Sequence, residues 1–247
     1  MLADTFIGSL QGHGHPGARI VPALVIASVF GFFGFLSRGV SRSGAIVGVA
    51  VAILIYVGLG VGGFVTLFGV FAIAWLTTRI GYSRKRQLGL AENRQGRNAG
   101  QVLANIAAAA VFATLAIFYR EFVFAAVGAL AEAAADTASS EVGEALSRRA
   151  RMITTWRSVP PGTDGAVSIP GTLAGMTAAM LVTYVAALTH AIPEFGFWLV
   201  AGAGYLGTVV DSLLGATLER THRLGNNAVN LLSTTAAGLI ALAMLVL

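Results

Sequence analysis

The chain has 247 residues, of which 56% are hydrophobic and only 11% are charged, and it contains no cysteine. Because soluble domains carry roughly 25% charged residues, this composition excludes an ordinary soluble domain and indicates an integral membrane protein. The absence of cysteine excludes disulfides, zinc–thiolate sites and thiol catalysis. The net charge of +5 does not indicate a nucleic-acid partner, since Lys and Arg gather in the cytoplasmic loops of membrane proteins.

Eight apolar segments are long enough to cross a bilayer, which takes about 17–25 residues of helix. After an N-terminal tail over residues 1–18, the expected helices are 19–37, 44–61, 63–80, 100–119, 122–146, 169–190, 195–218 and 228–247. We therefore predict an all-α, polytopic, multi-pass membrane protein in which residues 19–247 form a single transmembrane domain that carries the functional site. The sequence leaves both a monomer and a homo-oligomer open.

The basic residues predict the orientation of these helices. Segments 38–43, 79–100, 139–168 and 219–227 hold 14 of the 16 Lys and Arg residues. This bias places the four loops in the cytoplasm and both chain ends outside. Most polar residues of the chain gather on the same side, so we expect the site to face the cytoplasm. Arg84, Lys85 and Arg86 are expected only to hold their loop inside.

Two segments resemble each other. ADTASSEVGE (135–144) and VDSLLGATLE (210–219) each contain Asp followed by Thr or Ser, with a Glu eight residues after the Asp. A basic loop and a similar helix start follow each of them, which suggests repeated helix–loop–helix units in one orientation. The alternative is chance similarity in a chain rich in Gly, Ala and Val. If the repeat is real, Asp136 and Asp211 lie at equivalent depths and converge on one site.

Asp136 and Asp211 are the first candidates for chemistry. An ionisable residue within a span costs about 2.5–3.5 kcal/mol on insertion scales, so it indicates function by default. Helical spacing places Glu132, Asp136 and Ser140 on one face. Carboxylates from two helices, together with amide or hydroxyl oxygens, form a hard-oxygen site that suits Mg²⁺. The alternative is that each Asp caps a helix or pairs with an arginine.

Arg97 is a candidate phosphate ligand. It stands just ahead of a helix N-terminus, where free N–H groups and the helix dipole favour anions, and arginine binds phosphate through two hydrogen bonds. In the loop before the sixth helix, Gly162 and Gly165 would allow a phosphate or a base to approach the backbone closely. That signal is weak alone, and the Walker motif GxxxxGK[ST] is absent.

Five motifs occur in order: RNAGQVLAN, ADTASSEVG, PPGTDGAVSIPGTLAG, DSLLGATLE and NNAVN. They resemble the integral-membrane family that includes phytyl-phosphate kinase of tocopherol synthesis, which is distantly similar to phytol and dolichol kinases and to CDP-diacylglycerol and CDP-archaeol synthases. The resemblance implies transfer of phosphate from CTP or another NTP to an isoprenyl monophosphate, such as phytyl or geranylgeranyl phosphate. A CDP-lipid-forming cytidylyltransferase and a transporter of a small solute or lipid are the alternatives.

The resemblance also implies residue roles. Asp136 and Asp211 would bind the Mg²⁺–nucleotide complex. Independently of the resemblance, phosphoryl transfer depends on positioning, and Glu141 or Asp164 would orient the acceptor. The lipid tail would lie between helices while its phosphate reaches the cytoplasmic site. Motifs and resemblance together give the expected nucleotide-binding residues: Arg97, Asn98, Gln101, Asn105, Ser140, Arg157, Gly162, Asp164, Gly165, Ser212, Asn227 and Asn230.

Overall fold

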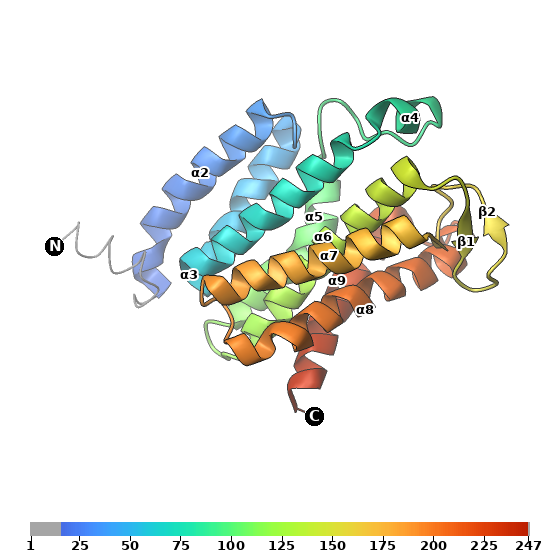
Figure 1. The fold of residues 1–247 in the computed structure, drawn as a ribbon. Helices are drawn as coiled ribbons and strands as arrows, with labels where there is room; N and C mark the ends of the chain where they lie inside the picture. The colour runs from blue at the N-terminus through green and yellow to red at the C-terminus, as the bar shows by residue number, and fades with distance from the viewer. Residues whose placement is uncertain (1–15, 247) are drawn as a thin grey trace.

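The structure is a computed structural model that describes residues 16–246, so most of the predicted tail lies outside the described residues. The all-α prediction is confirmed, and the helices form one bundle (Figure 1). Its elements are η1 (Pro16–Arg19), α2 (Ile20–Leu36), α3 (Arg42–Arg79), α4 (Tyr82–Gln87), α5 (Ala99–Leu115), α6 (Phe122–Leu146), α7 (Ile169–Leu188), η2 (Glu194–Gly196), α8 (Phe197–Leu214), the π-helical turn η3 (Gly215–Glu219) and α9 (Asn226–Val246).

Helix α3 is two membrane helices joined by a sharp turn at Gly60, whose φ of 70° and ψ of −160° are not helical. A straight helix of 38 residues would be about 57 Å long. Yet Trp75 Nε1, near the end of α3, donates a hydrogen bond of 3.1 Å to the carbonyl of Ser37, just before its start. The chain therefore folds back at Gly60, and α3 supplies both helices expected at 44–61 and 63–80 (Figure 1).

Helix α6 is the centre of the bundle, with α3, α5, α7, α8 and α9 packed around it. Six of the described helical segments are long and apolar enough to cross a membrane. In the most apolar 18-residue stretch of α6, 78% of the residues are buried, against 28–39% in the corresponding stretches of the other five. Small residues permit this packing, as they do between membrane helices generally. A Cβ at Gly175 of α7, for example, would lie 2.1 Å from Ser139 Oγ of α6. The outer helices expose large apolar side chains such as Val21, Phe32 and Trp198, which suits a lipid-facing surface.

The segment between α6 and α7 is not the plain loop that we expected, because it contains a small sheet. Strands β1 (Ala150–Met152), β2 (Ser158–Val159) and β3 (Ala166–Val167) pair antiparallel in the order β2-β1-β3. Strands of two or three residues are too short to show an alternating pattern in the sequence. The sheet lies at one end of the bundle (Figure 1).

Candidate functional site

A polar cavity of about 550 Å³ opens at the end of the bundle that carries the sheet. Its walls come from α5, α6, α7, α8 and α9, from the loop before α5 and from the segment between α6 and α7 that contains the sheet. Most of the residues that the sequence predicts for the site line this cavity: Arg97, Gln101, Asn105, Asp136, Ser140, Glu141, Gly162, Asp164, Gly165, Asp211, Ser212 and Asn230. Segments more than 100 residues apart in the chain thus meet around one space.

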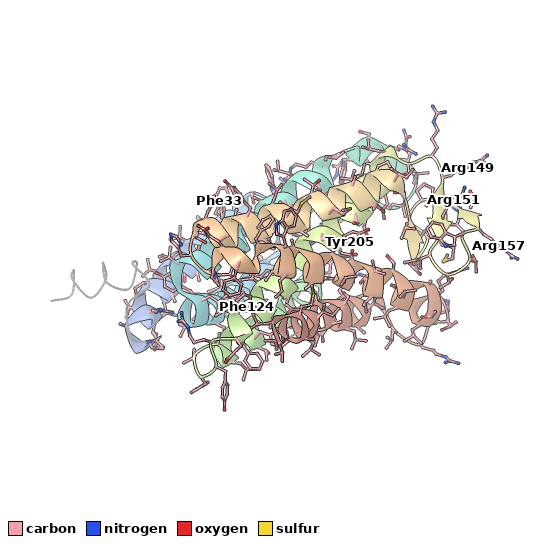
Figure 2. The ribbon with its side chains drawn as sticks, turned by 60° about the horizontal axis from the view of Figure 1, so that its bottom comes forward. Phe33, Phe124, Arg149, Arg151, Arg157 and Tyr205 are labelled. Atoms are coloured by element: carbon pink, nitrogen blue, oxygen red, sulfur yellow. The ribbon has the colours of Figure 1, made fainter. Side chains whose placement is uncertain are left out.

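Three predicted residues are not in the cavity wall. Asn98 caps α5, where its Oδ1 accepts a hydrogen bond of 3.1 Å from Gln101 N and its own N donates 2.9 Å to Gln101 Oε1. Asn227 lies against Gly100, since its Nδ2 is 2.9 Å from the position that a Cβ added to Gly100 would occupy. Arg157 is exposed just before β2, at the end of the molecule that carries the sheet (Figure 2).

Asp136 on α6 and Asp211 on α8 form the acidic centre of the cavity. The two side chains are close enough for their charges to interact, and Ser233 Oγ of α9 donates a hydrogen bond of 3.2 Å to Asp211 Oδ2. In residues 16–246 no Lys or Arg forms a salt bridge with either of them. The arginine pairing that we considered from the sequence is therefore not seen as a salt bridge, although Arg97 is close enough to Asp136 for their charges to interact.

This donor set fits a Mg²⁺ ion. Buried carboxylates without a salt-bridged cation are costly. The side-chain amides of Asn105 and Asn230 also line the cavity, and Asn230 Nδ2 donates a hydrogen bond of 3.5 Å to Asn105 Oδ1. Across residues 16–246 no group of three or more His, Asp or Glu is arranged to hold a metal by itself. Because Mg²⁺ is usually held by one or two carboxylates together with substrate phosphates, two carboxylates match that requirement.

Glu132 lies beside this centre but does not line the cavity, and we did not predict it as a site residue. It lies one helical turn from Asp136 and is only 1% exposed, and within the described part of the chain its Oε1 has no hydrogen-bond partner. It is close enough to both Asp136 and Asp211 to interact electrostatically with them. Gly207 of α8 makes room for it, since a Cβ there would lie 2.5 Å from Glu132 Cγ. The shared helix face was the sequence signal for this residue.

Glu141 is held by two other elements. Its Oε1 accepts a hydrogen bond of 2.8 Å from Thr78 Oγ1 of α3, and its Oε2 forms an ion pair with Lys85 of α4. Lys85 is fully buried and also donates 2.9 Å to the carbonyl of Thr78. The expectation that Lys85 only holds its loop inside is therefore wrong. Arg84 likewise donates to the carbonyl of Ala145 at 2.8 Å, so α4 is fastened to the end of α6.

Arg97 is fixed through its backbone and presents its side chain to the cavity. Its N donates 3.1 Å to Gly39 O, and its O accepts 2.9 Å from Ser41 N at the start of α3. Its Nε lies 3.9 Å from an oxygen of Glu92, and its charge interacts with that of Asp136. Because a guanidinium has five N–H donors, this long contact with Glu92 leaves donors for an anionic ligand.

Gly96 sets the position of Arg97. Alanine variants at Gly96 and at Gly89 form a matched pair that tests this role. Gly96 has φ of 80°, and a Cβ there would lie 2.6 Å from the backbone of Gly39 and Val40. Gly89 has a similar φ of 75°, but a Cβ there would meet nothing within 4 Å. Alanine in the left-handed region costs about 1–2 kcal/mol at either position. Gly96→Ala adds the clash, so it should lower the thermal unfolding temperature in detergent clearly more than Gly89→Ala. Equal losses would contradict this account.

The two loop glycines approach protein atoms rather than open space. Gly162 and Gly165 both have positive φ, 79° and 74°. A Cβ at Gly165 would lie 2.3 Å from Ala216 N of η3, and one at Gly162 would lie 2.5 Å from the side chain of Leu90. These glycines therefore let the 160–165 segment pack closely, which places Asp164 at the cavity wall.

Comparison with known proteins gives a family match and several relatives. A family model described as integral membrane protein DUF92 matches residues 25–238. An uncharacterized membrane protein of Methanocaldococcus jannaschii is 32% identical over 223 residues, covering 90% of this chain and 92% of that protein. One from Synechocystis is 31% identical, covering 77% and 76%. The chloroplastic protein VTE6 of Arabidopsis thaliana is 29% identical, covering 85% and 66%. No solved structure gives a significant match.

Proposed function

Because this chain belongs to the DUF92 integral membrane family, which confirms the family resemblance seen in its motifs, we propose that it is a membrane kinase for lipid phosphates. The proposed reaction transfers the terminal phosphate of CTP, or of another NTP, to an isoprenyl monophosphate such as phytyl or geranylgeranyl phosphate. The observation that carries the proposal is the polar cavity, which gathers Asp136, Asp211 and Arg97 around one space at the end of a membrane bundle. Its volume of about 550 Å³ is within the range of about 300–1,000 Å³ for small-molecule sites.

The chemistry requires little beyond what the cavity offers. An oxygen of the lipid phosphate attacks the terminal phosphorus of the nucleotide, the bond between that phosphorus and the bridging oxygen breaks, and the nucleoside diphosphate leaves. Such transfers depend on positioning and charge neutralisation rather than on a covalent nucleophile. A phosphate monoester has its second pKa at about 6, so the acceptor is largely ionised near neutral pH and needs no strong base.

Each part of the site then has a role. Asp136 and Asp211 would hold Mg²⁺ together with the nucleotide phosphates, and the ion would neutralise charge on the group being transferred. Arg97 would bind an anionic phosphate from the side of α5. Glu141, tied to Lys85 and Thr78, would position the wall of the cavity rather than contact substrate.

The cytoplasmic orientation of the cavity is also a proposal, and the contacts among the basic loops support it. Val40 and Arg97 form a backbone bridge between the first two basic loops. Arg84 donates to the carbonyl of Ser147 at the start of the third loop, and Arg220 of the fourth contacts Met152 of the sheet at 3.8 Å. All four basic loops thus meet at the end with the cavity, the end that the charge bias assigns to the cytoplasm.

The test is incubation of the purified protein in detergent with CTP, Mg²⁺ and geranylgeranyl phosphate, followed by analysis of both products. The kinase releases CDP and forms the lipid diphosphate. The alternative cytidylyltransferase, which needs the same carboxylates and lipid, releases pyrophosphate and forms a CDP-lipid. Failure to form either product with any NTP or isoprenyl chain length would contradict an enzymatic function and leave transport as the alternative. Chelation with EDTA should abolish turnover, and added Mg²⁺ should restore it.

A further inference from the structure

A second, smaller cavity lies beside the polar one, between α2, the two halves of α3, α5 and α6. Its walls are almost wholly apolar and include Phe30 and Gly34 of α2, Val70 and Phe71 of α3, and Ile106 of α5. We call it the apolar groove. Its volume of about 80 Å³ is much smaller than the 550 Å³ of the polar cavity.

The apolar groove and the polar cavity are adjacent and share part of their walls. Four residues line both of them: Arg97, Gln101, Asn105 and Thr137. A ligand that occupies both spaces would therefore contact the shared wall that Arg97 helps to form. That arrangement is complementary to a molecule with an anionic head and an apolar chain, because the head meets the cation where the polar surface begins.

The space beside Gly48 shows that protein atoms do not fill this groove. Gly48, in the first half of α3, lines the groove, and a Cβ added there would meet nothing within 4 Å. Gly44, one turn earlier on the same helix, is packed tightly instead, since a Cβ there would lie 2.2 Å from Arg97 O. Protein interiors are normally close-packed, so open apolar space next to a bilayer favours an apolar chain as its occupant.

We propose that the apolar groove binds the first carbons of the isoprenyl chain of the lipid-phosphate acceptor, with Arg97 binding its phosphate. This assignment rests on the proposed kinase function and adds where the acceptor lies relative to the nucleotide. Because the groove is small, it takes only the part of the chain next to the phosphate, and the remainder lies in the hydrocarbon of the bilayer. The nucleotide then occupies the polar cavity on the other side of Arg97.

Two glycine variants test the groove against a matched control. Gly48→Leu places a side chain in the open space of the groove, whereas Gly69→Leu, in the second half of α3, adds the same side chain where a Cβ also meets nothing but outside both cavities. Gly48→Leu should raise the KM for geranylgeranyl phosphate at least about tenfold, the effect of displacing two or more buried methylenes. The KM for CTP should change little. Gly69→Leu should change neither value, and equal effects of the two variants would overturn the proposal.

A binding measurement keeps this test independent of turnover. A photoreactive geranylgeranyl phosphate with a diazirine near its head is irradiated with the protein in the absence of nucleotide, and the labelled peptides are identified. Labelling should fall on α2, α3 or α5 and should drop at least about fivefold in Gly48→Leu, but not in Gly69→Leu. Labelling in the groove without turnover by any NTP would support the groove and contradict the kinase.

Competition separates the lipid phosphate from an ordinary bilayer lipid. Unlabelled geranylgeranyl phosphate should suppress the labelling at much lower concentration than geranylgeraniol, which lacks the charge that Arg97 binds. Equal suppression by the two compounds would show a groove that takes any apolar chain and would overturn the proposal. Labelling confined to α7 and α8, or no labelling at all, would overturn it as well.

Discussion

Replacing Asp136 with Asn is expected to lower kcat with CTP and geranylgeranyl phosphate by about 10²–10³-fold, the usual effect of removing one group that stabilises charge in a transition state. The fold should survive, because no Lys or Arg in residues 16–246 is salt-bridged to Asp136 and the change leaves no such partner unpaired. The measurements are the initial rate of product formation and the thermal unfolding temperature of the protein in the same detergent. Asp211→Asn should behave in the same way.

The control for this variant is Glu121→Gln, which removes a carboxylate charge from the exposed residue just before α6, outside the polar cavity. Its rate and unfolding temperature should both match those of the wild type. Wild-type turnover in Asp136→Asn would remove this residue from the site. A large fall in the unfolding temperature of Asp136→Asn would instead indicate a structural role for the carboxylate.

Replacing Lys85 with Met is expected to lower the free energy of unfolding by about 3–5 kcal/mol, because removal of one partner leaves the other as an uncompensated buried charge. That partner is Glu141, whose side chain is 11% exposed while that of Lys85 is 0% exposed. The measurement is equilibrium unfolding in mixed detergent micelles. Because Lys85 fastens α4 to α6, the loss should also lower turnover by moving the cavity wall.

Arg86→Met is the matched control, since Arg86 is the adjacent cation on α4 and is exposed. Such surface changes are usually within about 0.5 kcal/mol. Adding Glu141→Leu to Lys85→Met should recover much of the stability, because the buried charge is then gone. A Lys85→Met protein as stable as Arg86→Met would contradict the buried ion pair.

The membrane helices could be predicted from the sequence because each is constrained by the thickness of the bilayer. The expected helices 44–61 and 63–80 place the turn within α3 at Gly62, but it occurs at Gly60, and hydropathy does not separate these positions. The sheet after α6 could not be predicted, since its strands are shorter than any periodic signal.

In the candidate site, too, some residues could be predicted from the local sequence and others depend on how the helices pack. Asp136 and Asp211 stand out in the sequence because charges within spans are rare, and the structure brings both to one cavity. Asn98 was assigned to nucleotide, yet its spacing to Gln101 also fits a capping box, which the sequence alone could have shown. We predicted that Lys85 only holds its loop in the cytoplasm. Its burial depends on how α4 packs against α6, and no local sequence pattern encodes that packing.

The most direct test of the phosphoryl-transfer account follows the terminal phosphate itself. Purified protein is incubated with CTP labelled with ³²P in the terminal position, Mg²⁺ and geranylgeranyl phosphate, and the label is located after extraction of the lipid. We predict that the label appears in geranylgeranyl diphosphate with the wild-type chain and is lost with Asp136→Asn. Label recovered in pyrophosphate, or a lipid fraction without label, would contradict the account.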